Sequence, residues 1–341
     1  MTFRIVQLFV SCAIFPALAG CWSASPNAVV VYTALDSEFS EPIFADFSRE
    51  SGLRVLPKFD VESTKTVGLT EALIAERARP RCDVFWNNEI LHTLRLEKLG
   101  LLAEYTPAIA KTYPAEFRSA RGNWCGFAAR ARVLLVNTEL VAAPQRPASI
   151  RDLVDPQWQG RVAIAKPLFG TTATQAACLF VAWGNERAEK FFRELKANAQ
   201  ILSGNKQVAQ AVAAGQVAFG LTDTDDAIVE VERGSPVAIV YPDQEPGSLG
   251  TLFIPNTISI LKDCPNPEAA RKLVDFVLSP AVEEQLARGP SAQIPLGSES
   301  QLVPRIETPR TVRAMQIDFD EALDKWPVAA QFLRDEFATG Q

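Results

Sequence analysis

Three aspartates lie close together in the sequence, at Asp223, Asp225 and Asp226. They directly follow the apolar run 217–221, which is typical of a buried strand. Because ligands of an open α/β sheet bind beyond the carboxyl ends of its strands, we expect these side chains to face a cleft. Packed carboxylates repel one another unless a cation neutralises them, so the cluster indicates a metal ion or an ammonium group. The alternative is that Asp223 or Asp225 caps the next helix, where aspartate is favoured.

A candidate anion site precedes another predicted helix at Gly170, Thr171 and Thr172. Free backbone N–H groups at a helix start, together with two hydroxyls, are suited to an anion. A simple threonine N-cap is the alternative. Arg130 could hold the same anion through its planar guanidinium, unless it forms a salt bridge at the surface or between lobes.

Asp36 and Asn88 come at the ends of the first and third predicted strands. Ligand residues of a first lobe belong there, so both residues, and Glu89 beside Asn88, are candidates for the site. Asp36 could equally cap a helix. His92 lies inside a predicted helix, where a lone histidine is more often structural than a ligand.

The composition argues against most catalytic machinery. His92 is the only histidine, so a histidine metal site or a Ser-His-Asp triad has almost nothing to draw on. The sequence contains no GxSxG, HExxH or P-loop motif, so we expect no enzyme and no ATP hydrolysis by this chain. An exported metal-dependent hydrolase that uses the aspartates is the remote alternative. With a net charge of −6 and no basic stripe, the chain is not expected to bind nucleic acid.

The elements that must position these residues alternate between strand and helix. Apolar runs at 29–32, 53–56 and 83–86 predict strands, and helices are predicted between and after them. This order predicts a parallel sheet with crossover helices. A second α/β unit follows a long strand that includes 132–136. Helices are expected at 37–50, 71–79, 89–99, 172–183, 186–197, 206–214, 267–278, 280–288 and 319–337, with a short one after Ser149, and further strands at 161–165, 217–221, 237–241 and 251–261.

The length of 341 residues suits two domains better than one core. No flexible linker is visible, so we expect the chain to pass between lobes inside strands, near Ala128 and near Gly250. The predicted division is 29–128 for the first lobe, 129–249 for the second, and 250–341 for the return to the first lobe and the C-terminal helices.

The first residues are typical of an exported lipoprotein. Arg4 precedes the apolar run 5–17, which is too short to span a bilayer. Small residues then lead to Cys21 in a sequence that looks like a lipobox, which implies cleavage after 1–20 and diacylation of this cysteine. Residues 21–28 would form a lipidated tether on the extracytoplasmic side of the cell envelope. The alternative is an ordinary secretory signal in which Cys21 is incidental.

Four cysteines remain in the folded part, and their spacing fits no metal or redox motif. Export permits disulfides, and four cysteines allow three pairings, among which the sequence does not choose. Buried free thiols are the alternative. The four are Cys82, Cys125, Cys178 and Cys264.

Five segments, in this order, resemble the bacterial periplasmic solute-binding proteins of the ferric-ion-binding type. The resemblance implies a two-lobed periplasmic-binding-protein fold of type II, with a mixed, mostly parallel sheet and flanking helices in each lobe and crossing strands as the hinge. The segments are Val30-Val31-Tyr32 with the acidic helix that leads to 50–55, Cys82-Asp83-Val84-Phe85-Trp86, Arg130-Ala131-Arg132-Val133, Asp155-Pro156-Gln157-Trp158-Gln159-Gly160-Arg161, and Pro267-Glu268-Ala269-Ala270 through Ser279.

The resemblance also implies positions for the ligand residues. Ferric-binding members typically hold the ion with two adjacent tyrosines, a histidine and a carboxylate, and hold an accompanying anion at the segment that matches 170–172. In this chain the tyrosine segment falls at 220–226, which contains no tyrosine, and the histidine position falls near Asp36. The carboxylate position falls at Asn88, with Glu89 beside it.

We therefore expect a substrate-binding lipoprotein of an ABC importer, which acts as a monomer with a separate permease and its ATPase. Two ligand classes remain open. One is ferric ion, or another hard cation, held by carboxylates and an auxiliary anion. The other is a zwitterion or organic anion, such as an aminoalkylphosphonate, a phosphate ester or a carboxylate, whose acidic group meets 170–172. No cofactor is certain, and ferric ion would be the transported ligand.

Overall fold

The computed structural model describes residues 27–60 and 66–338. The predicted signal peptide, the lipobox at Cys21 and most of the tether lie outside the described residues. Within these described ranges, no helix is both long and apolar enough to cross a membrane.

The first lobe is a parallel sheet that continues into antiparallel strands. Its central strand is rich in β-branched residues and largely buried, as expected for a strand covered on both faces. β1 pairs in parallel with β2 and β3, and β3 pairs antiparallel with β9. The strands are β1 (Ala28–Thr33), β2 (Arg54–Phe59), β3 (Val84–Asn87) and β9 (Phe253–Ile260), and the helices of the same region are α1 (Ser37–Ser51), α2 (Val67–Ala75), α3 (Leu91–Lys98), α8 (Pro267–Val277) and α9 (Pro280–Arg288).

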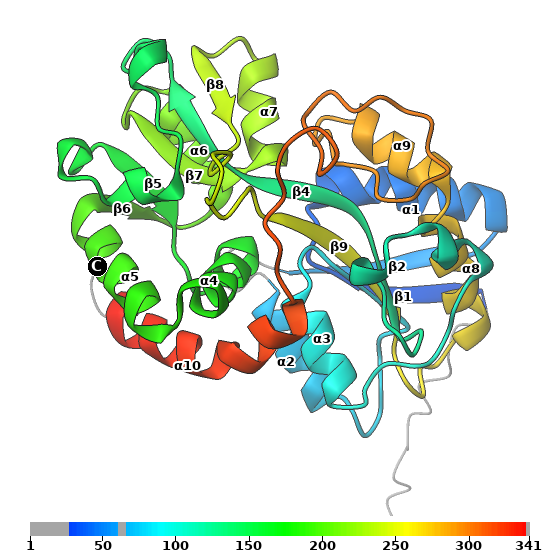
Figure 1. The fold of residues 1–341 in the computed structure, drawn as a ribbon. Helices are drawn as coiled ribbons and strands as arrows, with labels where there is room; N and C mark the ends of the chain where they lie inside the picture. The colour runs from blue at the N-terminus through cyan, green and yellow to red at the C-terminus, as the bar shows by residue number, and fades with distance from the viewer. Residues whose placement is uncertain (1–26, 61–65, 339–341) are drawn as a thin grey trace, which may run out of the picture.

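One long buried strand, β4 (Trp124–Asn137), belongs to both halves of the molecule. Its first part pairs with β9, and its second part pairs with β7 and β8. The pairing with β9 shifts register between Phe127 and Arg130, where Ala128 has a φ of 42°. Figure 1 shows β4 and β9 running side by side between the two groups of elements. These crossing strands give the two-lobed α/β fold that the sequence predicted.

The second lobe repeats the alternation of strand and helix. β5 pairs in parallel with β6 and β7, so their carboxyl ends point to the same edge of the sheet. The strands are β5 (Val162–Ala165), β6 (Ala199–Leu202), β7 (Phe219–Asp223) and β8 (Val237–Val240), and the helices are α4 (Gly170–Trp183), α5 (Asn185–Asn198), α6 (Asn205–Ala213) and α7 (Thr224–Glu232).

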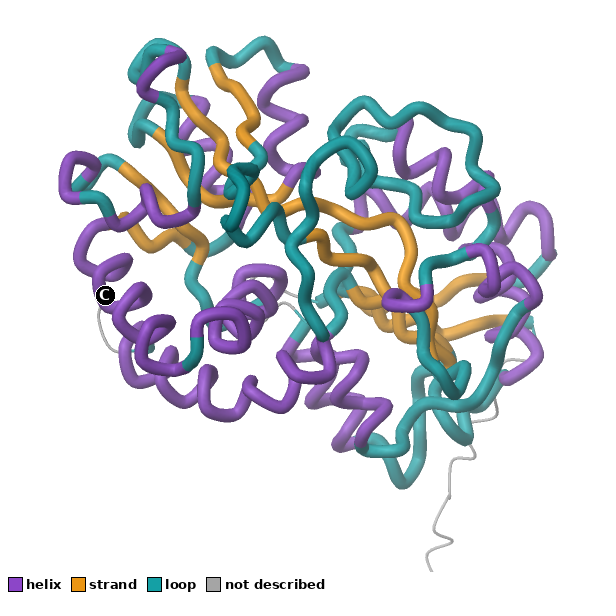
Figure 2. The backbone as a smooth tube through the Cα atoms, viewed as in Figure 1, coloured by secondary structure: helices purple, strands orange, loops and turns teal. Residues whose placement is uncertain are grey.

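The C-terminal helix α10 (Phe319–Phe337) packs against both lobes. Near its start, the ring of Phe319 packs on Phe117 with the centroids 6.5 Å apart, and Asp324 pairs with Lys98 of α3. Its last residues, among them Leu333, join the core formed by α4, α5 and β5. In Figures 1 and 2 this helix lies along one side of the molecule, beneath α4 and next to α3. It is therefore a second connection between the lobes, apart from the crossing strands.

Most predicted elements are present, with local corrections. α2 ends at Ala75 instead of continuing toward Pro80, and the segment capped by Ser149 is a 3-10 helix, Ile150–Val154. β6 was not predicted, because this strand is short and only half-buried. The four cysteines of the described part are free thiols. The division at 128 and 249 stays a prediction, although α10 packs on the second lobe as well as on the first.

Candidate functional site

A cavity that is open to solvent lies between the lobes. It is formed by the loops after β1, β3, β5, β6 and β7 and by Arg130 of β4. This is the edge at which the parallel strands end, as expected for a ligand site of an open α/β sheet. All the predicted ligand residues except Glu89 line it: Asp36, Asn88, Arg130, Gly170, Thr171, Thr172, Asp223, Asp225 and Asp226.

Glu89 is buried beside the cavity but serves the protein itself. Its carboxylate accepts hydrogen bonds from the backbone N–H groups of Leu91 (2.6 Å) and His92 (3.0 Å), at the start of α3. It also accepts from Asn87 Nδ2 at 2.7 Å and from Thr174 Oγ1 at 2.8 Å. The structure therefore gives Glu89 the role of a helix cap, because its oxygens are directed at the first turn of α3 and at Thr174 of α4, and not into the cavity.

Asp223 is neutralised from within the chain. Its carboxylate accepts from Arg132 Nη1 at 2.7 Å, Thr171 Oγ1 at 2.5 Å and Asn205 Nδ2 at 2.9 Å. Arg132 is fully buried and lies directly opposite Asp223 in the β4–β7 pair. This internal partner was not predicted from the sequence, which had indicated an external cation for the aspartates. The available signal was the spacing of Arg130 and Arg132, which puts both side chains on one face of a strand.

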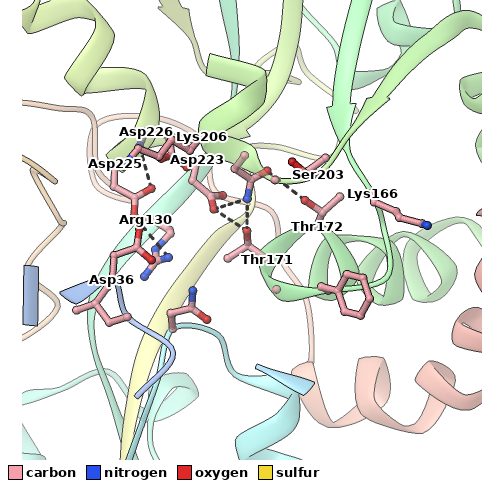
Figure 3. Close-up of a pocket in the computed structure, with 17 residues that line it drawn as sticks. Asp36, Arg130, Lys166, Thr171, Thr172, Ser203, Lys206, Asp223, Asp225 and Asp226 are labelled. Atoms are coloured by element: carbon pink, nitrogen blue, oxygen red, sulfur yellow. Dashed lines mark hydrogen bonds and ion pairs between the residues drawn. The ribbon is translucent and has the colours of Figure 1, made fainter. Parts of the chain in front are cut away.

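Arg130 reaches the cavity wall next to the other aspartates. Its Nη1 lies 3.5 Å from Asp225 Oδ2, and its Nη2 donates to Asn256 Oδ1 at 3.0 Å. Burial alone would lower the pKa of Arg130, but the nearby aspartates raise it above its usual value, Asp225 most strongly. Arg130 is therefore a permanent cation in the wall, directed at the side of the cavity that holds Asp36 and Asp225 (Figure 3).

Four helices begin at the cavity, and none is capped by the side chain of its N-cap residue. The starts of α1 and α7 carry acidic residues: Asp36 precedes α1, and Asp225 and Asp226 lie in the first turn of α7. The starts of α4 and α6 carry no acidic residue in their first turns. The cavity therefore has an acidic half at α1 and α7, and a half at α4 and α6 with the partial positive charge of two helix N-termini. The carboxylate that borders the second half, Asp223, is paired with Arg132.

Two lysines that the sequence analysis missed line the same cavity. Lys166 follows β5 and belongs to the half at α4, whereas Lys206, in the first turn of α6, lies beside Asp226 of the acidic half (Figure 3). Lys206 Nζ lies 3.2 Å from Glu38 Oε1 of α1, across the opening between the lobes. This hydrogen bond raises the pKa of Lys206. The sequence feature that could have identified the two lysines is their position, directly after β5 and at the start of α6.

None of the four tyrosines lines the cavity, and each hydroxyl has a partner elsewhere. Tyr32 and Tyr105 donate to Glu76 and Asp275, at 2.9 Å and 2.8 Å. Burial raises the pKa of Tyr105 and of Tyr241 to about 12. The remaining two contacts are from Tyr113 Oη to the carbonyl of Leu278 and from the Glu307 N–H to Tyr241 Oη.

The three aspartates nevertheless come together as predicted. One carboxylate oxygen from each of Asp223, Asp225 and Asp226 lies within 4.8 Å of the other two. Asp225 Oδ1 accepts from the Asp226 N–H at 3.1 Å, so this aspartate is held at the start of α7. Neither Asp223 nor Asp225 makes the simple N-cap bond that the sequence analysis gave as the alternative; as the N-cap residue, Asp223 leaves its own helix uncapped.

Comparison with known proteins places this geometry in a family. Residues 91–322 match the family described as bacterial extracellular solute-binding protein. Iron uptake protein A1 of Synechocystis is 27% identical over 294 residues, which cover 83% of this chain and 80% of that protein. A periplasmic protein of Salmonella typhimurium named for binding 2-aminoethylphosphonate is 24% identical over 282 residues, which cover 80% of each chain.

A solved structure matches over nearly its whole length. Iron-bound HitA from Pseudomonas aeruginosa superposes with a TM-score of 0.82 and 26% identity, covering 91% of this chain and 99% of that one. The two lobes and the crossing strands of this chain thus share the overall fold of that structure. The chain belongs to the bacterial extracellular solute-binding protein family.

Proposed function

We propose that this protein captures a small solute between its lobes and delivers it to an ABC permease. Its family and the named relatives, which are transport proteins and not enzymes, support this role. Both lobes contribute to the cavity, so a ligand makes its full set of contacts only when the lobes are closed. Binding would therefore stabilise the closed form, which the permease would recognise.

The ligand that the geometry supports best carries an acidic group at one end and an amine or hydroxyl at the other. The observation that carries this proposal is the division of the cavity. The uncapped starts of α4 and α6, together with Lys166, suit a phosphonate, phosphate or carboxylate. Asp36 and Asp226 on the opposite half suit an ammonium or hydroxyl group.

Ferric ion with an accompanying anion is the second candidate. The oxygens of Asp223, Asp225 and Asp226 are close enough to share a cation, and two of the named relatives bind or take up iron. Carboxylate oxygen suits a hard cation. In this case the anion would occupy the α4 and α6 half. Asp223 is already paired with Arg132, and no tyrosine lines the cavity. Both observations favour the organic ligand.

A thermal-shift screen of the purified protein in metal-free buffer tests the two ligands. We expect 2-aminoethylphosphonate to raise the melting temperature, since a ligand at 100 times its Kd adds about 2.7 kcal/mol to the unfolding free energy. Exchange of Lys166 for Gln should weaken this effect, and so should exchange of Asp226 for Asn. If ferric citrate is the only compound that raises the melting temperature, the organic ligand is contradicted and the iron carrier is supported. No response to any small solute would contradict the receptor function.

The cellular arrangement is also part of the proposal. Lipidation at Cys21 would hold a monomeric receptor at the extracytoplasmic face of a membrane, close to its permease. Labelling cells with a radioactive fatty acid checks this point. Exchange of Cys21 for Ala should abolish the label and release the protein from the membrane fraction.

A further inference from the structure

Helix α4 is held on two sides by buried hydrogen bonds. Toward the second lobe, Gln175 Oε1 accepts from Arg132 Nε at 2.8 Å. Toward the first lobe, Thr174 donates to Glu89 Oε2 at 2.8 Å. Thr174 and Glu89 are each only 1% exposed, and neither lines the cavity. The Thr174–Glu89 bond therefore joins the lobes directly behind the ligand site.

The carboxylate of Glu89 is fixed by its own lobe before α4 approaches. Three of its hydrogen bonds come from Asn87, Leu91 and His92, all within a few residues. Its backbone carbonyl also accepts from Thr257 Oγ1 of β9 at 3.3 Å. Because these bonds leave little freedom to the side chain, one oxygen is presented in a constant direction toward the second lobe. A preorganised charged acceptor of this kind forms a strong hydrogen bond with a hydroxyl.

We propose that Glu89 and Thr174 form a latch that stabilises the closed lobes and positions the N-terminus of α4 over the cavity. Thr174 is one helical turn beyond Gly170, whose segment lines the anion-binding half. The latch rests on the proposed capture by lobe closure but not on which ligand is captured. Glu89 and Thr174 are positioning residues, since both act on the ligand through α4.

Exchange of Thr174 for Val tests the latch, because it removes the hydroxyl and keeps the shape of the side chain. Small-angle X-ray scattering of the ligand-free variant should give a larger radius of gyration than the wild type, since the open form gains population. Thr174→Ser keeps the hydroxyl and should restore the wild-type value. Thr70→Val is the matched control: it removes a buried hydroxyl that bonds only within the first lobe, to the Thr66 carbonyl at 2.7 Å.

Affinity for 2-aminoethylphosphonate provides a second readout. The Thr174→Val change should raise its Kd roughly tenfold, the effect of losing one hydrogen bond to a charged group. If the radius of gyration of Thr174→Val equals that of the wild type, the latch is overturned, whether or not 2-aminoethylphosphonate binds. If the wild type does not bind 2-aminoethylphosphonate, the proposed ligand is contradicted, and the scattering experiment still tests the latch.

Discussion

Asp223 and Asp226 lie three positions apart, yet their surroundings differ. Asp223 is 2% exposed and is paired with a fully buried arginine, Arg132. Asp226 is half-buried at the cavity surface. A buried charge that loses its partner is strongly destabilising, whereas a partly exposed one can still be hydrated. The same residue type should therefore contribute to folding at one position and to binding at the other.

The change Asp223→Ala should lower the unfolding free energy by about 3–5 kcal/mol, because the guanidinium of Arg132 would remain buried without its counter-charge. Urea denaturation followed by tryptophan fluorescence measures this loss. Asp226→Ala is the comparison, and it should cost much less stability while it weakens ligand binding. Equal losses of stability in the two variants would show that the Arg132 pair is not the cause.

The positions of the candidate site residues could be predicted from the sequence, but the roles of some of them could not. The positions of Asp36, Asn88 and the aspartates could be predicted because ligand residues follow strand ends. The roles of Glu89 and Arg132 could not, since each depends on which neighbour the fold places opposite the side chain. A carboxylate before a helix can cap it or face a ligand, and only the direction of its oxygens distinguishes these roles.

At the scale of elements, the crossing strand β4 contains an irregularity that buried groups support. Ala128 has a φ of 42°, a left-handed conformation that is unfavourable for a residue with a Cβ. Its N–H donates to Glu283 Oε1 at 2.9 Å. The same carboxylate accepts from the N–H groups of Leu296 and Gly297, also at 2.9 Å. Glu283 thus joins β4 to the segment after α9 at the place where the chain passes between lobes.

Glu283→Ala should destabilise the protein by about 3 kcal/mol or more, because three buried N–H groups would lose their acceptor at about 1–3 kcal/mol each. Calorimetric unfolding measures the effect. Glu283→Gln retains one acceptor oxygen and should lose clearly less. If the Gln variant were as unstable as the Ala variant, the charge of Glu283 and not its acceptor geometry would hold the irregularity.

Elements could be predicted from the sequence wherever burial leaves a pattern. The apolar runs of β1 and β3 and the periodicity of α10 gave their positions because these elements are packed against a core. β6 was missed because its four residues are mixed in polarity and partly exposed at a sheet edge. The convergence of four helix starts on one cavity could not be predicted, since it depends on the order of strands in space.

At the scale of the whole molecule, α10 connects the two lobes. Its proline, Pro327, lies where the contacts of the helix change from the first lobe to the second. Before Pro327, Asp324 pairs with Lys98 of α3 in the first lobe. After it, the ring of Phe337 packs on Phe192 of α5 in the second lobe, with the ring centroids 6.4 Å apart. Proline has no N–H, so the helix lacks one backbone hydrogen bond at this position and can bend there. We therefore expect α10 to flex at Pro327 when the lobes move on the crossing strands.

Pro327→Ala should stiffen this connection and reduce the change in radius of gyration between ligand-free and ligand-loaded protein. It should also raise the melting temperature, because alanine in a helix interior is favoured over proline by up to about 3 kcal/mol. Small-angle X-ray scattering, with whichever probe of the thermal-shift screen binds, measures the lobe movement.

Pro42→Ala is the matched control, since Pro42 lies inside α1, which belongs to the first lobe only. Both variants should gain stability, but only Pro327→Ala should restrict the movement. A full movement in Pro327→Ala would mean that α10 shifts as a rigid body over one of the lobes and that the crossing strands alone form the hinge.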